Sequence, residues 1–461
     1  MAAEIRRNRL GRFTLTRSAV TLSFFREDTT DIPAKNMKFG AMVIVALALR
    51  LAAVAFLYPE RLSPNRDHWR FAGETGRIAQ SIVAGKGFSS PLFGETGPTA
   101  WMTPIYPYMV AGTFKIFGIY TKPSAIILLS LNSLFSALTC VPIFFIARRN
   151  FGYRVARAAG WTWAFFPYAI YFSADFIWAT TLTTFLLSLI FLCALHLEDS
   201  TRPIVWIGFG LLCGISALTD PIVLSVVPLL GAWACSRHYQ CVRKWALAAA
   251  GAALAFLVVV MPWFVRNYRV FHVAIPFRDN FGLELYLGNN GDTWHFAPSG
   301  HHPSDSASEM SEYAQLGESA FMARKRRQAF EYISGHPGTF IFLSLRRMIY
   351  MWTSFWSFSS RYLQEENLDP PNIVLCTTMT VLALLGLRRA YRERSSLVMP
   401  YAIVLVFFPL VYYITHPEDY YRRPIDPILL VPAVYAVVSR VRRSKGLPLE
   451  DEKPLSVTAA S

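Results

Sequence analysis

Residues 124–147 read SAIILLSLNSLFSALTCVPIFFIA, and Arg148-Arg149 follow directly. An apolar run of this length is typical of a helix that spans the hydrocarbon core of a bilayer. The composition agrees, because 53% of the 461 residues are hydrophobic and only 16% are charged, whereas a soluble globular protein is usually about 25% charged. The sequence therefore predicts an all-α, multi-pass integral membrane protein. It excludes a soluble enzyme, a disordered chain and a secreted disulfide scaffold.

Ten apolar segments are long enough to be predicted as membrane-spanning helices. They are residues 38–58, 124–147, 155–172, 176–197, 203–219, 222–236, 245–264, 370–387, 396–414 and 424–440. Two further apolar stretches, 101–118 and 338–358, are predicted as interfacial helices. A span at 101–118 would move all later basic turns to the other side of the membrane, and Arg346 and Arg347 would be costly at the centre of a span.

Loop charges predict the orientation and the organisation of the chain. Basic clusters follow spans two, six, eight and ten, so by the positive-inside rule these turns and the basic N-terminal tail face the cytoplasm. The predicted parts are a cytoplasmic tail (1–37), a transmembrane module (38–264) with the first outer loop at 59–123, a second outer loop with an interfacial helix (265–369), C-terminal transmembrane helices (370–440) and a cytoplasmic tail (441–461).

The net charge of +15 lies largely in these basic clusters. It therefore reflects membrane orientation, and we expect membrane lipid and no nucleic acid as a partner. None of the six cysteines lies in the two long outer loops, so no disulfide framework or zinc motif is predicted.

The first outer loop contains a short amphipathic helix. Within FAGETGRIAQSIVAGKGF, residues 71–88, Ile78 and Ile82 recur at helical spacing, and Gly85 ends the helix. Glu74 lies at the N-terminal end of this helix. The helix is therefore predicted to lie on the bilayer surface, with an acidic residue just outside the first span.

The order of motifs on the predicted outer side resembles the polyprenyl-phosphate-sugar-dependent glycosyltransferases. This group has the GT-C fold and includes the dolichyl-phosphate-mannose protein mannosyltransferases. After Glu74 the motifs are Ile-Ala and Gly-x-Gly-Phe, PIYPY at 104–108, FP at 166–167, SAD at 173–175, ALTDP at 217–221, PWFVRNY at 262–268, GLELYLGN at 282–289 and YRRPIDP at 421–427. The resemblance covers about residues 38–440 and implies a GT-C fold.

The resemblance also implies an activity. Members move a sugar from a polyprenyl-phosphate donor to an acceptor hydroxyl on the outer face of the membrane, with inversion; the acceptor is a protein, a lipid or a glycan. A glycosyl phosphate has a good leaving group, so the enzyme chiefly needs a carboxylate that deprotonates the acceptor and positive charge for the departing phosphate. We expect a bacterial plasma membrane with the active site facing the periplasm.

Two acidic residues are the predicted catalytic groups. The resemblance implies that Glu74 is the general base and that Asp175 supports it. The alternative for Glu74 is stabilisation of its own helix N-terminus, and Asp175 is tolerated at the interface if it is solvated. Asp220 is a supporting candidate, although its position before Pro221 is equally typical of a helix cap.

The predicted ligands of the donor phosphate are Arg266 and the pair Arg422/Arg423. A guanidinium suits phosphate because it is permanently charged and presents a planar donor fork. The alternative is anchoring of the span ends by snorkelling, and Asp426 offers Arg422 a partner at helical spacing.

Arg50 and Tyr106 complete the supporting candidates. A charge inside a span, such as Arg50, indicates either function or a buried pair with an acid. A divalent metal ion is the other source of positive charge for the phosphate. However, Met102-Thr103-Pro104 stands where the aminoarabinose transferases of this fold carry Glu-Lys-Pro, which argues against that activity and weakens a metal site. The histidines at 295–302 lack the spacing of a zinc site.

Two other classes of protein remain open. A lipid-linked sugar transporter or flippase would carry acids and cations deep in its spans, where only Arg50 is placed. A noncatalytic membrane assembly subunit would use the two outer loops as docking surfaces. Transfer of a labelled lipid-linked sugar, translocation without transfer, or neither would separate the three.

Overall fold

The computed structural model describes residues 33–61, 70–237, 242–293, 300–354, 356, 369–418 and 420–444. The regular elements in these residues are helices, as predicted. The chain divides within α1 (Pro33–Arg61) into a short unit that ends at Ala41 and a main unit from Met42 onward. The predicted cytoplasmic tails lie mostly outside the described residues.

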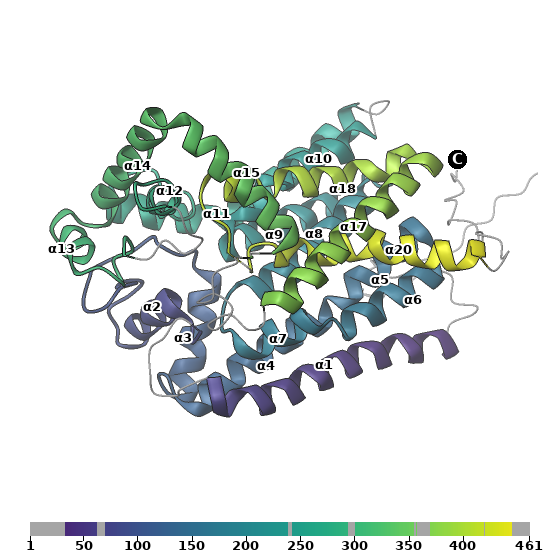
Figure 1. Ribbon diagram of the computed structural model, residues 1–461, viewed down its shortest axis with the longest axis horizontal. Helices are drawn as coiled ribbons and strands as arrows, with labels where there is room; N and C mark the ends of the chain where they lie inside the picture. Colours follow the sequence, from purple (N-terminus) through teal and green to yellow (C-terminus); the bar gives the residue numbers. More distant parts are fainter. Residues whose placement is uncertain are drawn as a thin grey trace, which may run out of the picture. The chain divides into compact units, whose positions relative to one another are not determined.

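Apolar helices form most of the main unit (Figure 1). After α1 they are α4 (Lys122–Leu138), α5 (Cys140–Phe151), α6 (Tyr153–Ala164), α7 (Pro167–Asp175), α8 (Thr180–Leu197), α9 (Pro203–Thr219), η3 (Pro221–Ser225), α10 (Val227–Ser236), α11 (Val242–Phe271), α17 (Asp369–Glu393), η5 (Ser395–Leu397), α18 (Val398–Phe407), α19 (Leu410–Ile414), η6 (Arg423–Ile425) and α20 (Asp426–Ser444).

Six segments of the described chain are long and apolar enough to cross a membrane, and Gly40–Phe56, Pro203–Thr219 and Pro221–Ser236 are shorter apolar helices. The six are Lys122–Phe151, Thr180–Leu197, Trp245–Phe271, Pro371–Glu393, Ser395–Ile414 and Arg423–Arg442. The predicted span 155–172 is divided between α6 and α7, because Pro167 begins a new helix. The chain is therefore an all-α integral membrane protein.

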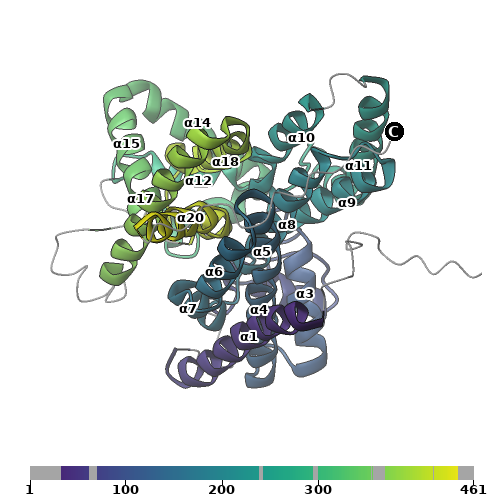
Figure 2. The ribbon, with the colours of Figure 1, turned by 90° about the vertical axis from the view of Figure 1, so that its right-hand side faces the viewer.

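α8 is the central helix of the bundle, in contact with α5, α9, α10 and α20. Figure 2 shows α9, α10 and α11 on one side of α8, and α17, α18 and α20 on the other. Small residues allow the tightest pairs. A Cβ on Gly210 of α9 would lie 2.0 Å from the Ala252 carbonyl oxygen of α11, and a Cβ on Gly386 of α17 would lie 2.0 Å from that of Pro432 of α20.

The helices of the two outer loops are α2 (Gly73–Val83), α3 (Ile105–Phe117), α12 (Phe281–Gly288), α13 (Ala307–Leu316), α14 (Glu318–Gly335) and α15 (Pro337–Thr353). Figure 1 shows α2, α12, α13 and α14 together at one end of the apolar bundle. The helix predicted before Gly85 is confirmed as α2, and helices α3 and α15 occupy the stretches predicted as interfacial.

Arg50 is completely buried and joins three helices. Its Nε donates to Ser136 Oγ of α4 at 2.7 Å, and its Nη1 donates to the carbonyl of Ala46 in α1 at 3.0 Å. Nη1 and Nη2 also donate to the carbonyls of Ala164 and Trp163, both at 3.1 Å. The acidic partner that we expected is thus replaced by a hydroxyl and backbone carbonyls, which satisfy the guanidinium inside the bundle.

Candidate active site

Arg70 connects the start of α2 to the turn between α7 and α8. Its Nη1 donates to Asp175 Oδ2 at 2.9 Å, and its carbonyl accepts a hydrogen bond from Ile177 N at 3.0 Å. Asp175 is only 1% exposed, whereas the Arg70 side chain is 26% exposed, so the ion pair reaches from the protein interior to its surface. The two predicted catalytic acids, Glu74 and Asp175, are therefore placed on neighbouring segments that Arg70 holds together.

Glu74 is half-buried in the first turn of α2. The turn before it is unusual, because Ala72 and Gly73 both have positive φ values, 71° and 46°, and this conformation is strained for alanine. It brings α2 close to the α7–α8 turn: a Cβ on Gly73 would lie 3.8 Å from Cζ2 of Trp178. Glu74 makes no hydrogen bond or ion pair with any described residue.

Tyr106 acts on the α7–α8 turn from the inside. Its hydroxyl donates to Asn132 Oδ1 at 3.2 Å, and Asn132 Nδ2 donates to the carbonyl of Phe176 at 2.8 Å. Tyr106 is 1% exposed. It therefore supports the segment that carries Asp175 without reaching solvent.

Asp220 and Arg278 form a second, more open part of the site. Asp220 Oδ1 accepts a hydrogen bond from Ile222 N at 3.2 Å, so it caps η3, as the alternative to a functional role predicted. The same oxygen lies 4.0 Å from Arg278 Nη2, and the side chains of Arg278 and Asp220 are 33% and 22% exposed. Burial raises the pKa of Asp220, although Arg278 opposes the shift.

Glu284 of α12 pairs with His416 from the segment after α19. Glu284 Oε2 lies 2.7 Å from His416 Nε2, and Asn280 Nδ2 donates to Glu284 Oε1 at 2.8 Å. His416 Nδ1 is also 3.8 Å from Glu418. Burial alone would lower the pKa of His416, but the carboxylate of Glu284 raises it above the ordinary value.

Sequence reasoning missed Arg278, Glu284 and His416. Glu284 lies within the motif at 282–289 but was not singled out there, and His416, 132 residues further along the chain, lies outside the motifs. Apart from that motif, the sequence contained one indication of these residues: charged residues recur in the segments predicted to lie on the outer side.

A row of aromatic rings links these charged groups. Ring centroids of Trp178 and Tyr420 are 5.6 Å apart, those of Tyr420 and Tyr421 are 4.9 Å apart, and those of Tyr421 and Tyr412 are 4.4 Å apart. Trp178, Tyr420 and Tyr421 are half-buried, whereas Tyr412 is buried.

Tyr420 lies where the acidic groups converge. Burial, together with the carboxylates of Glu418, Glu284 and Glu74, raises the pKa of the Tyr420 hydroxyl well above its ordinary value. These carboxylates come from α2, from α12 and from the segment that carries Tyr420 itself.

Arg422 and Arg423 follow this row directly and are tightly held. Arg422 Nε pairs with Asp426 Oδ1 at 2.8 Å, and Arg423 Nη1 pairs with Asp426 Oδ2 at 2.9 Å. Arg422 Nη1 also donates to the carbonyl of Trp352 at 2.8 Å, and Arg423 Nη2 donates to Asn372 Oδ1 at 3.0 Å. Both side chains are buried.

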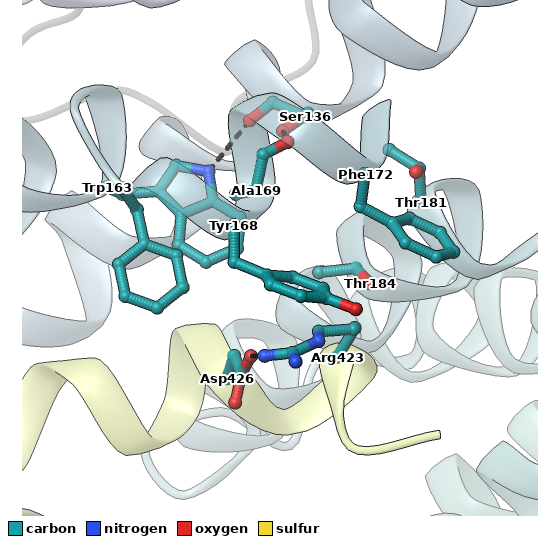
Figure 3. A pocket seen from close by; sticks show the side chains of 10 residues that line it. Ser136, Trp163, Tyr168, Ala169, Phe172, Thr181, Thr184, Arg423 and Asp426 are labelled. Atoms are coloured by element: carbon teal, nitrogen blue, oxygen red, sulfur yellow. Dashed lines mark hydrogen bonds and ion pairs between the residues drawn. The ribbon is translucent and has the colours of Figure 1, made fainter. Parts of the chain in front are cut away.

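Arg423 also lines an aromatic pocket (Figure 3). Its guanidinium carbon lies 3.3 Å from the ring centroid of Tyr168, and Trp163, Phe166 and Phe172 form the apolar wall. Phe172 also packs beside Tyr420, with ring centroids 6.0 Å apart, so the pocket adjoins the ring of Tyr420.

Arg266 of α11 holds the first outer loop. Its Nη1 donates to the carbonyl of Thr99 at 2.6 Å and to Asn267 Oδ1 at 2.9 Å, and its Nη2 donates to the carbonyl of Phe88 at 2.7 Å. It also lies beside the Trp263 ring, 5.0 Å from the centroid. These donors are thus used within the protein.

Within the described parts of the chain, no group of three or more His, Cys, Asp or Glu side chains is placed to hold a metal ion. Of the three histidines considered for a zinc site, His301 pairs with Asp292 at 2.8 Å, and His295 lies outside the described residues.

This chain is similar to several known proteins. Residues 101–265 match the family model described as dolichyl-phosphate-mannose-protein mannosyltransferase. No curated protein sequence gave a match. The structure of ArnT from Cupriavidus metallidurans bound to undecaprenyl phosphate is 15% identical, with a TM-score of 0.38, over 90% of this chain and 79% of ArnT.

The archaeal oligosaccharyltransferase AglB from Archaeoglobus fulgidus, solved with an inhibitory peptide and a dolichol-phosphate, has a TM-score of 0.50 at 12% identity. The match covers 89% of this chain and 52% of AglB, so the chain spans about half the length of that protein. The chain therefore has the GT-C fold, and its residues 101–265 carry the pattern of the dolichyl-phosphate-mannose-protein mannosyltransferase family.

Proposed function

We propose that this protein is a membrane glycosyltransferase that moves a sugar from a polyprenyl-phosphate donor to an acceptor hydroxyl, with inversion, on the outer face of the membrane. The GT-C fold and the family pattern at 101–265 support this proposal. AglB was solved with a dolichol-phosphate and a peptide, which favours a lipid-linked donor here. The acceptor is a protein, a lipid or a glycan.

The observation that carries the proposal is that Glu74, unlike the other acids of the site, has no hydrogen-bond or ion-pair partner among the described residues. Asp175 is paired with Arg70, Glu284 with His416, and Asp220 caps η3, whereas Glu74 has no hydrogen-bond or ion-pair partner in the described chain. A half-buried carboxylate without an internal partner is suited to accept a proton. We therefore assign Glu74 as the general base.

The reaction then proceeds in one displacement. The acceptor oxygen bonds to the anomeric carbon while its proton moves to Glu74. The bond from that carbon to the phosphate oxygen breaks, and polyprenyl phosphate leaves with the electron pair. Asp175 supports the base through Arg70, because their ion pair holds the α7–α8 turn against the segment that leads to Glu74.

We infer that Arg278 binds the departing phosphate. Its side chain is 33% exposed and makes only a loose 4.0 Å contact with Asp220, so its donors are open to a ligand. Arg266, by contrast, donates to backbone carbonyls of the first outer loop. Arg422 and Arg423 share Asp426, and we infer that they hold the tyrosine segment in place.

The test is transfer of radiolabel from a panel of polyprenyl-phosphate sugars to membrane acceptors in reconstituted vesicles. Glu74→Gln keeps the shape of the side chain and removes the base, so the transfer rate is expected to fall at least about 100-fold. Glu331→Gln, an exposed position on α14, is the matched control and is expected to behave as wild type. Near-normal transfer by Glu74→Gln would refute the base assignment, and translocation of label without transfer would favour a transporter.

A further inference from the structure

The half-buried side chains of Trp178, Tyr420 and Tyr421, here called the aromatic row, run continuously between two chemically opposite groups. At one end, α2 abuts Trp178: a Cβ on Gly73 would lie 3.8 Å from its ring, and the charge of Glu74 acts on Tyr420. At the other end, Tyr421 stacks on Tyr412, and Arg278 interacts electrostatically with both hydroxyls. The aromatic row therefore has α2 against its Trp178 end and Tyr412 stacked against its Tyr421 end.

Aromatic rings of this kind are suited to bind a sugar. The face of each ring carries partial negative charge and attracts the weakly positive C–H groups on the apolar side of a pyranose. The polar edge of the sugar then needs hydrogen-bond acceptors. His416 lies beside Tyr421, with ring centroids 5.7 Å apart, and is 2.7 Å from Glu284 and 3.8 Å from Glu418. These two carboxylates supply such acceptors beside the row.

The order of the groups matches the stereochemistry of an inverting reaction. In a single displacement, the attacking and departing oxygens lie on opposite sides of the anomeric carbon. A base at the Trp178 end and a phosphate-binding cation at the Tyr412 end place the two oxygens in this way. A sugar that lay elsewhere in the site would not have both groups at opposite sides.

The two halves of the aromatic row are held rigidly. The turn that carries Trp178 is fixed by the Arg70–Asp175 ion pair, and the segment that carries the tyrosines is fixed by Arg422 and Arg423 on Asp426. Preorganisation of this kind lowers the entropy lost when a ligand is positioned.

We propose that the aromatic row is the platform on which the sugar ring of the lipid-linked donor lies, between Glu74 and Arg278. This inference rests on the proposed glycosyl transfer. It adds the side chains that recognise the sugar. Trp178 and Tyr420 bind the sugar ring, and they do not bind the lipid phosphate.

The test compares two ligands that differ only in the sugar: polyprenyl-phosphate mannose and sugar-free polyprenyl phosphate. Binding of each is measured with the full-length protein in nanodiscs. Trp178→Ala and Tyr420→Ala are expected to raise the Kd for the mannose lipid about tenfold and to change the Kd for the sugar-free lipid less than about twofold. Trp178→Phe and Tyr420→Phe keep the stacking face and are expected to retain wild-type binding.

Two controls accompany these variants. Arg278→Gln is expected to weaken binding of both lipids, because it removes the phosphate partner. Tyr391→Ala removes an exposed aromatic ring of α17 that is not part of the row and is expected to change neither Kd.

The inference is overturned if Trp178→Ala raises the Kd for both lipids equally, since the row would then recognise the lipid or only support the fold. It is also overturned if the alanine variants bind both lipids as wild type does. Failure of the proposed function is distinguishable, because it is an absence of transfer by the wild-type protein, whereas this binding assay requires no transfer.

Discussion

The carboxylate of Glu74 forms no hydrogen bond or ion pair with a described residue. Arg70, four residues earlier, forms an ion pair with the buried Asp175. The two acids thus have different environments although both were predicted from motifs of the same kind. A free, half-exposed carboxylate is able to exchange a proton, whereas a buried and paired one chiefly holds its neighbours in position. At the scale of residues, therefore, hydrogen-bond partners separate the proposed base from its support.

The Arg70–Asp175 pair offers a test of this distinction. Arg70→Gln would remove the guanidinium that lies 2.9 Å from Asp175, which is 1% exposed, and we expect a loss of about 1–3 kcal/mol in unfolding free energy. Thermal unfolding in detergent measures the loss. The double variant Arg70→Gln/Asp175→Asn is expected to regain part of the stability, because the buried charge is then removed. Equal stability of Arg70→Gln and wild type would contradict the structural role.

At the scale of elements, small residues and helix breaks decide which segments meet. Gly210 allows α9 and α11 to approach at backbone distance, and Asp220 at the end of α9 is thereby placed beside Arg278 in the segment after α11. Pro167 begins α7 as a separate helix, so Asp175 and Trp178 reach the site on a short turn. The prediction of one continuous span at 155–172 did not contain this break.

Gly210→Ala tests the α9–α11 contact. The added Cβ would lie 2.0 Å from the Ala252 carbonyl oxygen, which is backbone and has no freedom to rotate away. We expect a loss of about 1–3 kcal/mol in stability from overpacking, seen as a lower Tm. Gly231→Ala in α10 is the matched control, since nothing lies within 4 Å of its added Cβ, and it is expected to be neutral or slightly stabilising. Equal Tm shifts in both variants would contradict the packing argument.

At the scale of the whole molecule, a pair of acids fastens the two outer loops together. Glu318 of α14 accepts hydrogen bonds from Ala100 N and Thr99 Oγ1 of the first loop, both at 2.5 Å, and from Tyr313 OH at 2.9 Å. Asp279 N donates to the Ala100 carbonyl at 3.2 Å. Burial, and then the neighbouring Glu318, raise the pKa of Asp279 to about 8.

Asp279 therefore predicts a pH dependence. Its carboxyl is protonated in the folded protein at neutral pH but ionised in the unfolded chain, whose pKa is near 3.8. Folding then takes up a proton, so stability falls as pH rises from about 4 to about 8 and levels off above that range. Asp279→Asn removes this contribution, and its advantage in Tm over wild type is expected to grow up to about pH 8. Parallel Tm profiles of the two proteins would contradict the shift.

Much of the fold follows from local patterns. The apolar runs predicted the helices of the bundle, and the amphipathic pattern before Gly85 predicted α2, because both depend on residues close in the chain. The candidate site followed only in part. Glu74 and Asp175 were singled out in their motifs, whereas Glu284 was not singled out within its motif at 282–289, and Arg278 and His416 lie in none.

The sequence by itself determined the all-α membrane class and the GT-C resemblance, because hydropathy and motif order are linear properties of the chain. Only the tertiary structure decided which charges have partners: Glu74 has none among the described residues, Arg266 binds backbone carbonyls, and Arg422 shares Asp426 with Arg423. The physical reason is that pairing depends on distances between side chains that the fold brings together from distant segments. No residue type or spacing records those distances.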